Sequence, residues 1–566
     1  MDSKAKRVLV IGLDGATFDL IKPWADQGLL PNLSRLMKEG SFGNLRSTIQ
    51  PTTAPAWSTF MTGVNQAKHG LYDFVRRRPD SYNLEITNGS YVAAPSVFQI
   101  VSQAGGQVVS INVPYTFPPR PVNGIMVGGP FVPTVGPEIV YPREFFEKLK
   151  KIVPDYTVLP DYNSRADDPM ADYAKKLIRG IEMRETLAME LMASEPWQLF
   201  TVVFMATDEV QHTFWECMEA PAGSPSAKYS QVISQIYQRL DQAIGDLLLQ
   251  LEKVAAAQET TVIILSDHGG GPFRLMINLN HWLAEAGFLQ FRLEGNNLFK
   301  RVRARSIKQV AQAYRRYVPP KMRSTLRGLA GAERFEQAKG AFESALLTDF
   351  VDWTDTKAYS LGAGGNIYIN LVDREPQGIV QSGAEYEQLR EALIDALLSM
   401  RDPETGEAII EKVIKREELY SGPHLEQAPD LVIQWADYGY WGRGQYDVHS
   451  PVFENQRHFD FSDQPLTGSH RLEGILIVHG AEIEPNAGLN DAHIIDLAPT
   501  ILSLLGIKPL EVMDGRLLDE LLTPAGRERI QQLMDAGDVE EAAGEYAYDP
   551  DMAEKISEHL RALGYL

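Results

Sequence analysis

Short apolar runs alternate with longer amphipathic stretches along most of the chain. Runs rich in Val, Ile and Leu, typical of strands buried on both faces, cover residues 8–13, 108–112, 199–205, 261–265 and 475–479. Between them, residues 31–40, 142–152 and 231–254 have the spacing of helices with one apolar face. This alternation predicts an α/β fold, a three-layer α/β/α sandwich around a mostly parallel central sheet, with a helical insertion.

Two segments depart from the alternation. Residues 300–327 carry many Lys and Arg side chains and no Asp or Glu, and the last forty residues are acidic with helical spacing. We therefore divide the chain into a core at 1–282 and 351–522, a basic helical insertion at 283–350 and an acidic helical extension at 523–566. The insertion is either a solvated helical face or a cap or docking face for a phosphate-rich substrate or, through Lys300–Arg327, weakly for an anionic membrane.

Net charge and cysteine content argue against several classes of protein. With 54 Lys and Arg against 75 Asp and Glu, the 566 residues carry a net charge of −21, which argues against a nucleic-acid scaffold. An anionic substrate would need a local positive charge, such as a bound metal. The single cysteine, Cys217, excludes an intramolecular disulfide and a multi-cysteine zinc site. We find no signal sequence and no apolar stretch long enough to span a membrane, and we expect a cytoplasmic protein.

Acidic and histidine side chains follow three of the predicted strands. The carboxyl ends of parallel strands meet at one edge of a sheet, so these side chains are expected to lie close together. A lone aspartate at such a place is usually a helix cap, but several together favour one or two divalent cations. The candidate ligands are Asp14, Asp208, His212, Asp267, His268 and His470.

A hydroxyl-rich segment follows Pro51 and supplies a candidate nucleophile. Thr53 lies where helical spacing begins, so its hydroxyl would face the backbone N–H groups at the positive end of the helix dipole. Without the metal ligands, Thr53 would be read as an ordinary N-cap. A metal could activate its hydroxyl for attack.

The sequence resembles the alkaline phosphatase superfamily, in particular its nucleotide pyrophosphatase/phosphodiesterase members. Each motif alone is weak, but the ordered set runs over most of the chain. The set comprises Gly12-Leu13-Asp14-Gly15, Pro31-Asn32-Leu33, Thr53-Ala54-Pro55, Met61-Thr62-Gly63, His69-Gly70, Asp208 with His212, Ser266-Asp267-His268-Gly269, Gly468-Ser469-His470, Asp496-Leu497-Ala498-Pro499-Thr500-Ile501 and Met513-Asp514-Gly515.

The resemblance implies a two-metal phosphohydrolase that cleaves phosphodiester or pyrophosphate bonds of a small molecule. It implies two divalent ions, usually zinc, with manganese, iron or magnesium as alternatives. One ion would be held by Asp14, Thr53, Asp267 and His268, and the other by Asp208, His212 and His470. Thr53 would also be the nucleophile, giving a covalent phospho-threonine and net retention at phosphorus.

The chain departs from the family pattern near the substrate. The asparagine that relatives place beyond the His-Gly pair, to bind a phosphoryl oxygen, is missing from the Leu71-Tyr72-Asp73-Phe74 segment. Phe74 is a candidate wall for the leaving group. Lys68 and Arg46 are candidates for the additional cation that a phosphate monoester would need.

Three hypotheses remain open at this stage. The first is the diesterase or pyrophosphatase that uses Thr53. The second is a phosphomonoesterase or phosphomutase of the same superfamily. The third is a catalytically silent, metal-stabilised protein that binds anionic lipid, against which the complete set of seven candidate ligands argues. The sequence does not reveal the oligomeric state.

Overall fold

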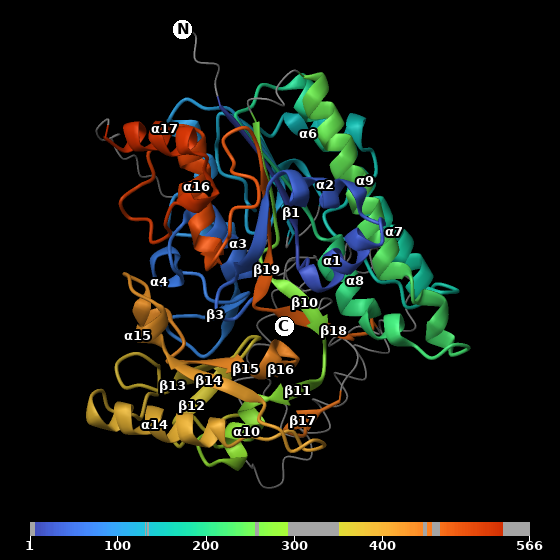
Figure 1. The fold of residues 1–566 in the computed structure, drawn as a ribbon. Helices are drawn as coiled ribbons and strands as arrows, with labels where there is room; N and C mark the ends of the chain where they lie inside the picture. Colours follow the sequence, from blue (N-terminus) through green and yellow to red (C-terminus); the bar gives the residue numbers. More distant parts are fainter. Residues whose placement is uncertain are drawn as a thin grey trace, which may run out of the picture.

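A nine-stranded sheet forms the centre of the computed structural model, which describes residues 6–130, 132, 135–254, 260–292, 350–444, 450–455 and 464–535 (Figure 1). Strand β19 runs antiparallel to its neighbours β2 and β9, and β7 runs antiparallel to β6, whereas the other pairings are parallel. Across the sheet the strands are β20 (Ala492–His493), β2 (Ser41–Arg46), β19 (Glu473–His479), β9 (Thr260–Leu265), β1 (Arg7–Leu13), β8 (Leu199–Phe204), β5 (Val108–Val113), β6 (Gly124–Gly128) and β7 (Val140–Tyr141).

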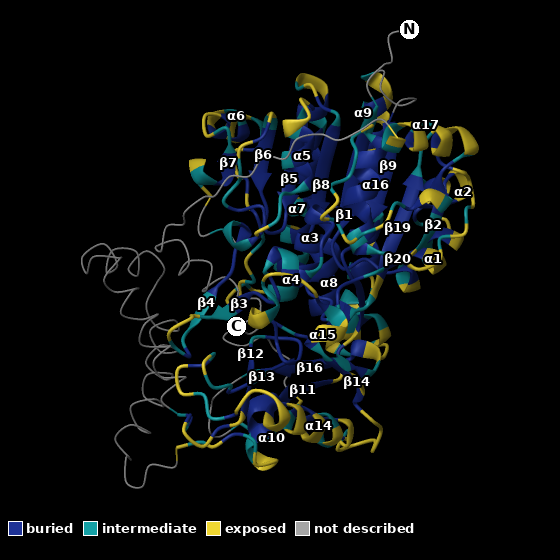
Figure 2. Ribbon diagram, turned by 90° about the vertical axis from the view of Figure 1, so that its left-hand side faces the viewer, coloured by how far each residue is buried: buried dark blue, intermediate teal, exposed yellow. Residues whose placement is uncertain are grey.

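Helices cover both faces of this sheet, which confirms the expected three-layer α/β/α sandwich (Figure 1). One face carries α1 (Phe18–Asp26), α2 (Pro31–Glu39), α6 (Phe145–Ile152), α7 (Pro169–Ser194), α8 (Ala206–Phe214) and α9 (Val232–Lys253). The other carries α3 (Thr53–Thr62), α4 (Gln66–His69), α5 (Val97–Gln103), α16 (Leu497–Leu504) and α17 (Pro524–Asp535). The central strands are buried on both sides, as their uninterrupted apolar runs predict (Figure 2).

A smaller unit lies below the sandwich in Figure 1 and has its own hydrophobic core. It contains a four-stranded antiparallel sheet and a separate three-stranded sheet. Its elements are β11 (Leu275–Asn278), α10 (Leu279–Glu285), β12 (Ala358–Leu361), β13 (Asn366–Ile369), α14 (Ala384–Leu398), β14 (Ile410–Lys415), α15 (Arg416–Leu419), β15 (Leu431–Trp435), β16 (Tyr440–Arg443) and β17 (Phe453–Glu454).

Two two-stranded sheets complete the described strands. Strand β10 (Gly269–Pro272) follows β9 and pairs with β18 (Gly468–Arg471), which leads back into the large sheet through β19. Figure 1 shows β10 and β18 between the sandwich and the smaller unit. Strands β3 (Val75–Arg77) and β4 (Leu84–Ile86) form the other sheet, which is a hairpin.

The smaller unit changes the boundaries that the sequence predicts. We expected residues 1–282 and 351–522 to form one core, but β11, α10 and residues 351–444 and 450–455 belong to the smaller unit. The chain rejoins the large sheet only after β18. Its four-residue strands lack the long buried runs that mark the sandwich. The basic segment Lys300–Arg327 lies outside the described residues, and of the acidic extension only α17 lies within them. No helix in the described part of the chain is long and apolar enough to cross a membrane.

Candidate metal centre

The first ligand cluster forms where β1 and β9 end side by side. Asp14 follows β1, and Asp267 and His268 follow β9; all three side chains are fully buried. His268 Nε2 lies 3.4 Å from Asp267 Oδ2 and 3.7 Å from Asp14 Oδ1. Because β1 and β9 pair in parallel, side chains from two distant parts of the sequence form one compact group of oxygen and nitrogen ligand atoms.

The second cluster joins α8 to β18. Asp208 and His212 are one helical turn apart, and Nε2 of His212 lies 3.3 Å from Oδ1 of Asp208. His470 Nε2 lies 3.0 Å from His212 Nε2 and 3.5 Å from Asp208 Oδ1. Ligand atoms held about 2.0–2.1 Å from a tetrahedral zinc ion stand about 3.3 Å apart, so this triangle has the size of one face of such a site.

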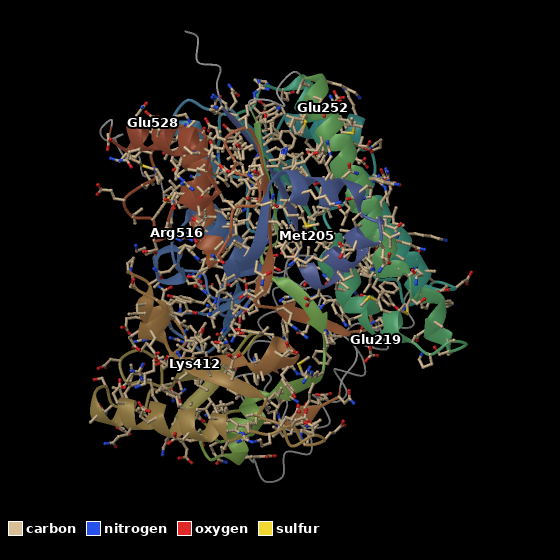
Figure 3. The ribbon with its side chains drawn as sticks, viewed as in Figure 1. Met205, Glu219, Glu252, Lys412, Arg516 and Glu528 are labelled. Carbon is tan, nitrogen blue, oxygen red and sulfur yellow. The ribbon has the colours of Figure 1, made fainter. Side chains whose placement is uncertain are left out.

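The two clusters adjoin each other. The rings of His268 and His470 are stacked with their centroids 3.8 Å apart, so one histidine of each cluster contacts the other. Gly15, with φ +67°, lets the chain turn beside the second cluster, because a Cβ there would stand 2.9 Å from Asp208 Oδ1. Met205, labelled in Figure 3, directly precedes α8, the helix that carries Asp208 and His212.

All three histidines are oriented by backbone carbonyls. Nδ1 of His212 lies 3.0 Å from the carbonyl oxygen of Gly468, Nδ1 of His268 lies 2.9 Å from that of Gly269, and Nδ1 of His470 lies 2.7 Å from that of Pro51. A carbonyl oxygen only accepts, so each Nδ1 carries the proton and each Nε2 is left to act as a ligand. This is the arrangement that metal-binding histidines adopt in proteins.

The buried polar atoms of the first cluster make it a candidate cation site. Asp14 Oδ1, Asp267 Oδ2 and His268 Nε2 are buried without a hydrogen-bond partner among the described residues. Burial, and then the neighbouring carboxylates Asp267 and Asp208, raise the pKa of Asp14 well above its usual range. Burying polar atoms without a hydrogen-bond partner destabilises the folded protein, because their lost hydration is not replaced. A divalent cation bound by these atoms would replace it.

The second cluster also attracts positive charge. Burial alone would lower the pKa of His212, but the Asp208 carboxylate raises it to about 9. Burial and the His268 ring lower the pKa of His470. Two bare nitrogen lone pairs 3.0 Å apart repel each other, so either a proton or a metal ion must lie at this point. The residues present therefore fit two metal sites.

Thr53 is the first residue of helix α3. Residues shortly before and after it contact the two clusters. Pro51, two residues earlier, accepts the hydrogen bond of His470, and Trp57, one turn later, donates from Nε1 to Asp14 Oδ2 over 2.8 Å. Thr53 is buried, and no side chain caps this helix start. The uncapped N-terminus offers backbone N–H groups to an anion beside the Thr53 hydroxyl. The sequence indicates Thr53 as a candidate, but it gives no sign that Trp57 would bind Asp14.

A small cavity lies beside His470, at the boundary between the sandwich and the smaller unit. The segment before Thr53 and strand β18 contribute one side of the lining, and the smaller unit contributes aromatic side chains. The lining residues are Gln50, Pro51, Thr52, Gly364, Trp435, Tyr438, Tyr440, Trp441, Ser469 and His470. The sequence does not identify these aromatic residues individually, because none of them belongs to a metal-ligand motif.

The three predicted substrate-binding residues lie in different settings. Lys68 Nζ is bound by Asp514 Oδ1 at 2.5 Å and by the Val512 carbonyl at 2.8 Å, so its charge is engaged by the C-terminal segment. Phe74 is fully buried in the sandwich core, with its ring 6.2 Å from that of Tyr115. Arg46 ends β2 and is half-buried. Lys68 and Phe74 therefore have structural contacts, and the substrate-binding role of all three residues stays a prediction.

Several motifs of the resemblance have structural partners. Asn32 Nδ2 donates to Asp241 Oδ2 over 3.0 Å, which fastens α2 to α9. Asp514 binds the backbone and side-chain nitrogens of Asn65. Asp496 accepts from the backbone nitrogen of Arg516 over 2.9 Å. These motifs hold helices and loops together around the ligands.

Two solved structures are among those similar to this chain, and the first has the same fold. A phosphonoacetate hydrolase from Sinorhizobium meliloti 1021, in complex with phosphonoacetate, is 15% identical, with 88% of this chain and 96% of that chain covered and a TM-score of 0.50. Human ectonucleotide pyrophosphatase / phosphodiesterase 5 is 15% identical, with 92% and 100% covered and a TM-score of 0.48. A comparison with curated protein sequences gives no match.

The sequence itself matches a family model. Residues 8–351 match the model described as type I phosphodiesterase / nucleotide pyrophosphatase. The matched range covers both β1 and β9, which carry the first cluster, and α8, which carries two ligands of the second. Since that model spans more than half of the chain and includes every ligand of the two clusters but His470, the chain belongs to the type I phosphodiesterase / nucleotide pyrophosphatase family.

Proposed function

We propose that this protein is a two-metal phosphoester hydrolase that cleaves phosphodiester or pyrophosphate bonds with Thr53 as nucleophile. Family membership supports phosphoester hydrolysis in general. The observation that carries the finer proposal is the orientation of His212, His268 and His470, each with Nδ1 on a backbone carbonyl and Nε2 in a cluster of carboxylates.

Asp14, Asp267 and His268 would hold one cation beside Thr53, and Asp208, His212 and His470 would hold the other. The bound cations would lower the pKa of the Thr53 hydroxyl and neutralise charge that develops on the phosphoryl oxygens. Zinc suits three-residue Asp/His sets, and manganese, iron or magnesium are the alternatives.

The chain's own groups then account for the two chemical steps. Thr53 Oγ1 forms a bond to phosphorus while the bond from phosphorus to the leaving oxygen breaks, and the hydroxyl proton passes to that oxygen or to solvent. The uncapped N-terminus of α3 presents backbone N–H groups to the transferred group. Water next attacks the phospho-threonine, which releases the product and restores the hydroxyl.

Replacing the nucleophile tests this proposal. In Thr53→Ala we expect turnover of bis(4-nitrophenyl) phosphate, 4-nitrophenyl phosphate and a dinucleoside pyrophosphate to fall by at least about a thousandfold, since the covalent route is lost. Metal content, measured by elemental analysis, should stay largely intact because the six Asp and His ligands remain. The wild-type rates on the mono- and diester substrates decide between a diesterase and a monoesterase or phosphomutase.

Thr62→Ala is the matched control. Its hydroxyl lies at the far end of the same helix and donates to the Ser58 carbonyl over 2.7 Å, so its loss should leave the rates near wild type. Unchanged hydrolysis by Thr53→Ala would contradict the nucleophile assignment. Salt-sensitive liposome binding by a wild-type protein that turns over no phosphoester would favour the lipid-binding alternative. A cytoplasmic location stays a prediction.

A further inference from the structure

The turn between β15 and β16 holds an aromatic side chain in an unfavourable backbone conformation. Asp437 has φ 52° and Tyr438 has φ 46°, and both lie in the left-handed region that non-glycine residues rarely adopt. Backbone strain of this kind persists only where the surroundings impose it. Here Arg471 Nη1 donates to the Tyr438 carbonyl over 3.0 Å, and the Arg274 backbone donates to the Gly439 carbonyl over 2.7 Å.

The strained turn is fastened to the strand that carries a metal ligand. Arg471, which binds the Tyr438 carbonyl, is the neighbour of His470 in β18. The Trp441 ring, three residues after Tyr438, meets the His470 ring edge-on with centroids 5.1 Å apart. The position of Tyr438 is thus fixed relative to the second ligand cluster.

The Tyr438 hydroxyl is buried and has no hydrogen-bond partner among the described residues. The residue is 7% exposed and lines the cavity together with Thr52, the neighbour of Thr53, and His470. A buried hydroxyl without a partner is rare, because its lost hydration is not compensated. A substrate oxygen in the cavity would provide the missing acceptor.

The electrostatic surroundings keep this hydroxyl a donor. Burial is the main cause that raises the pKa of Tyr438 above its usual range, and the charge of Arg46 lowers it only in part. The phenol therefore stays protonated over the working range of a hydrolase.

We propose that Tyr438, supplied by the smaller unit, binds substrate by donating a hydrogen bond from its hydroxyl to a phosphoryl oxygen of the group attacked by Thr53. The inference rests on the proposed function. It assigns the smaller unit a direct part in the reaction, because the donor comes from the β15–β16 turn.

The substitution Tyr438→Phe removes only the hydroxyl. We expect kcat/KM for the best phosphoester substrate to fall roughly 10- to 100-fold, as for other donors to a charged oxygen. The unfolding temperature should equal or exceed that of the wild type, because a buried hydroxyl without a partner is removed. A merely structural hydroxyl would give the opposite result, a lower unfolding temperature.

A binding measurement gives a second readout. Inorganic phosphate should bind the metal-loaded Thr53→Ala variant roughly tenfold more tightly than the Thr53→Ala/Tyr438→Phe double variant, as measured by calorimetry. Tyr156→Phe is the control, since it makes the same change at another buried hydroxyl without a partner, which lies in the sandwich core beside Arg184. It should leave kcat/KM and phosphate affinity at the wild-type values.

The outcomes separate the inference from the proposed function. A wild-type protein without turnover on any phosphoester overturns the proposed function. An active wild type whose Tyr438→Phe variant loses less than fivefold in kcat/KM, unfolds at a lower temperature or binds phosphate unchanged overturns the role of Tyr438 alone.

Discussion

At the scale of single residues, the sequence indicates the candidate ligands because three of them follow buried strands, whereas their division into two clusters was implied by the family resemblance. Asp14, Asp208 and Asp267 each follow an apolar run whose parallel pairing brings its end to the same edge of the sheet. The chemistry of the three histidines could not be predicted, because it depends on backbone carbonyls. Of these, Pro51 and Gly468 are distant in sequence from the histidines they orient.

Removal of the metal tests whether the candidate ligand residues bind cations. Chelation leaves the buried carboxylates without counter-charge, so the free energy of unfolding should fall by about 4 kcal/mol per site for an ion present at a thousandfold its Kd. Denaturant unfolding before and after treatment with EDTA measures the change, and added zinc should reverse it. EDTA already saturated with zinc is the control. Equal stability of the treated and untreated protein would contradict metal binding at these clusters.

At the scale of elements, the contact of β1 with α3 links the sheet to the site. Gly12 in β1 leaves room for the Trp57 ring, since a Cβ at Gly12 would stand 2.6 Å from Trp57 Cη2 and 2.9 Å from Val203 Cγ2. Trp57 in turn holds Asp14. The pattern of apolar residues predicts β1 and α3 separately. Their close approach at Gly12 could not be predicted, because it depends on how the two elements pack.

Gly12→Ala should therefore destabilise the protein by about 1–3 kcal/mol, because the added methyl overpacks the contact with Trp57. Metal affinity should fall with it, since Trp57 can no longer hold Asp14 in place. Denaturant unfolding and metal titration measure the two effects.

The control is the same substitution in an open helix position. At Gly180 in α7, the nearest heavy atom to an added Cβ is Arg184 Nη1 at 3.6 Å, so Gly180→Ala should add about 0.5–1 kcal/mol of stability through helix propensity. A similar effect at both glycines would refute the packing argument.

At the scale of the whole molecule, the sequence predicts the sandwich well and the smaller unit poorly. Long strands buried on both faces give an unambiguous apolar signal, whereas β12 and β13 have four residues each. The smaller unit is held together by buried polar groups as well as by its apolar core. Asp430 is fully buried and accepts two hydrogen bonds from Arg374, at 2.8 and 2.6 Å, and one from the Tyr386 hydroxyl at 2.6 Å.

Asp430→Asn should destabilise the smaller unit by about 3–5 kcal/mol near neutral pH, since Arg374 would be left buried without its counter-charge. Although burial opposes it, Arg374 and then Arg416 lower the pKa of Asp430 in the folded protein. The unfolded chain then binds the proton first as the pH falls, so the stability due to the carboxylate is present above about pH 4 and is lost below it.

Urea unfolding of wild type and variant between pH 3 and 8 measures this difference, which should shrink toward acid pH. Glu391→Gln removes the charge of a 61% exposed partner of Lys415 and should change the stability by less than about 0.5 kcal/mol. A difference between wild type and Asp430→Asn that does not vary with pH would contradict the assignment.

The chain completes the large sheet only after it has formed the smaller unit, and this has a consequence for truncated chains. Strand β19 pairs with both β2 and β9, and β18 before it carries His470, so both are synthesised after the smaller unit. A chain cut before residue 468 would lack the third ligand of one cluster and leave two facing strand edges unpaired. Exposed edges of this kind promote aggregation. Truncated products should therefore be removed as insoluble or degraded material and should not accumulate as enzymes with partial activity.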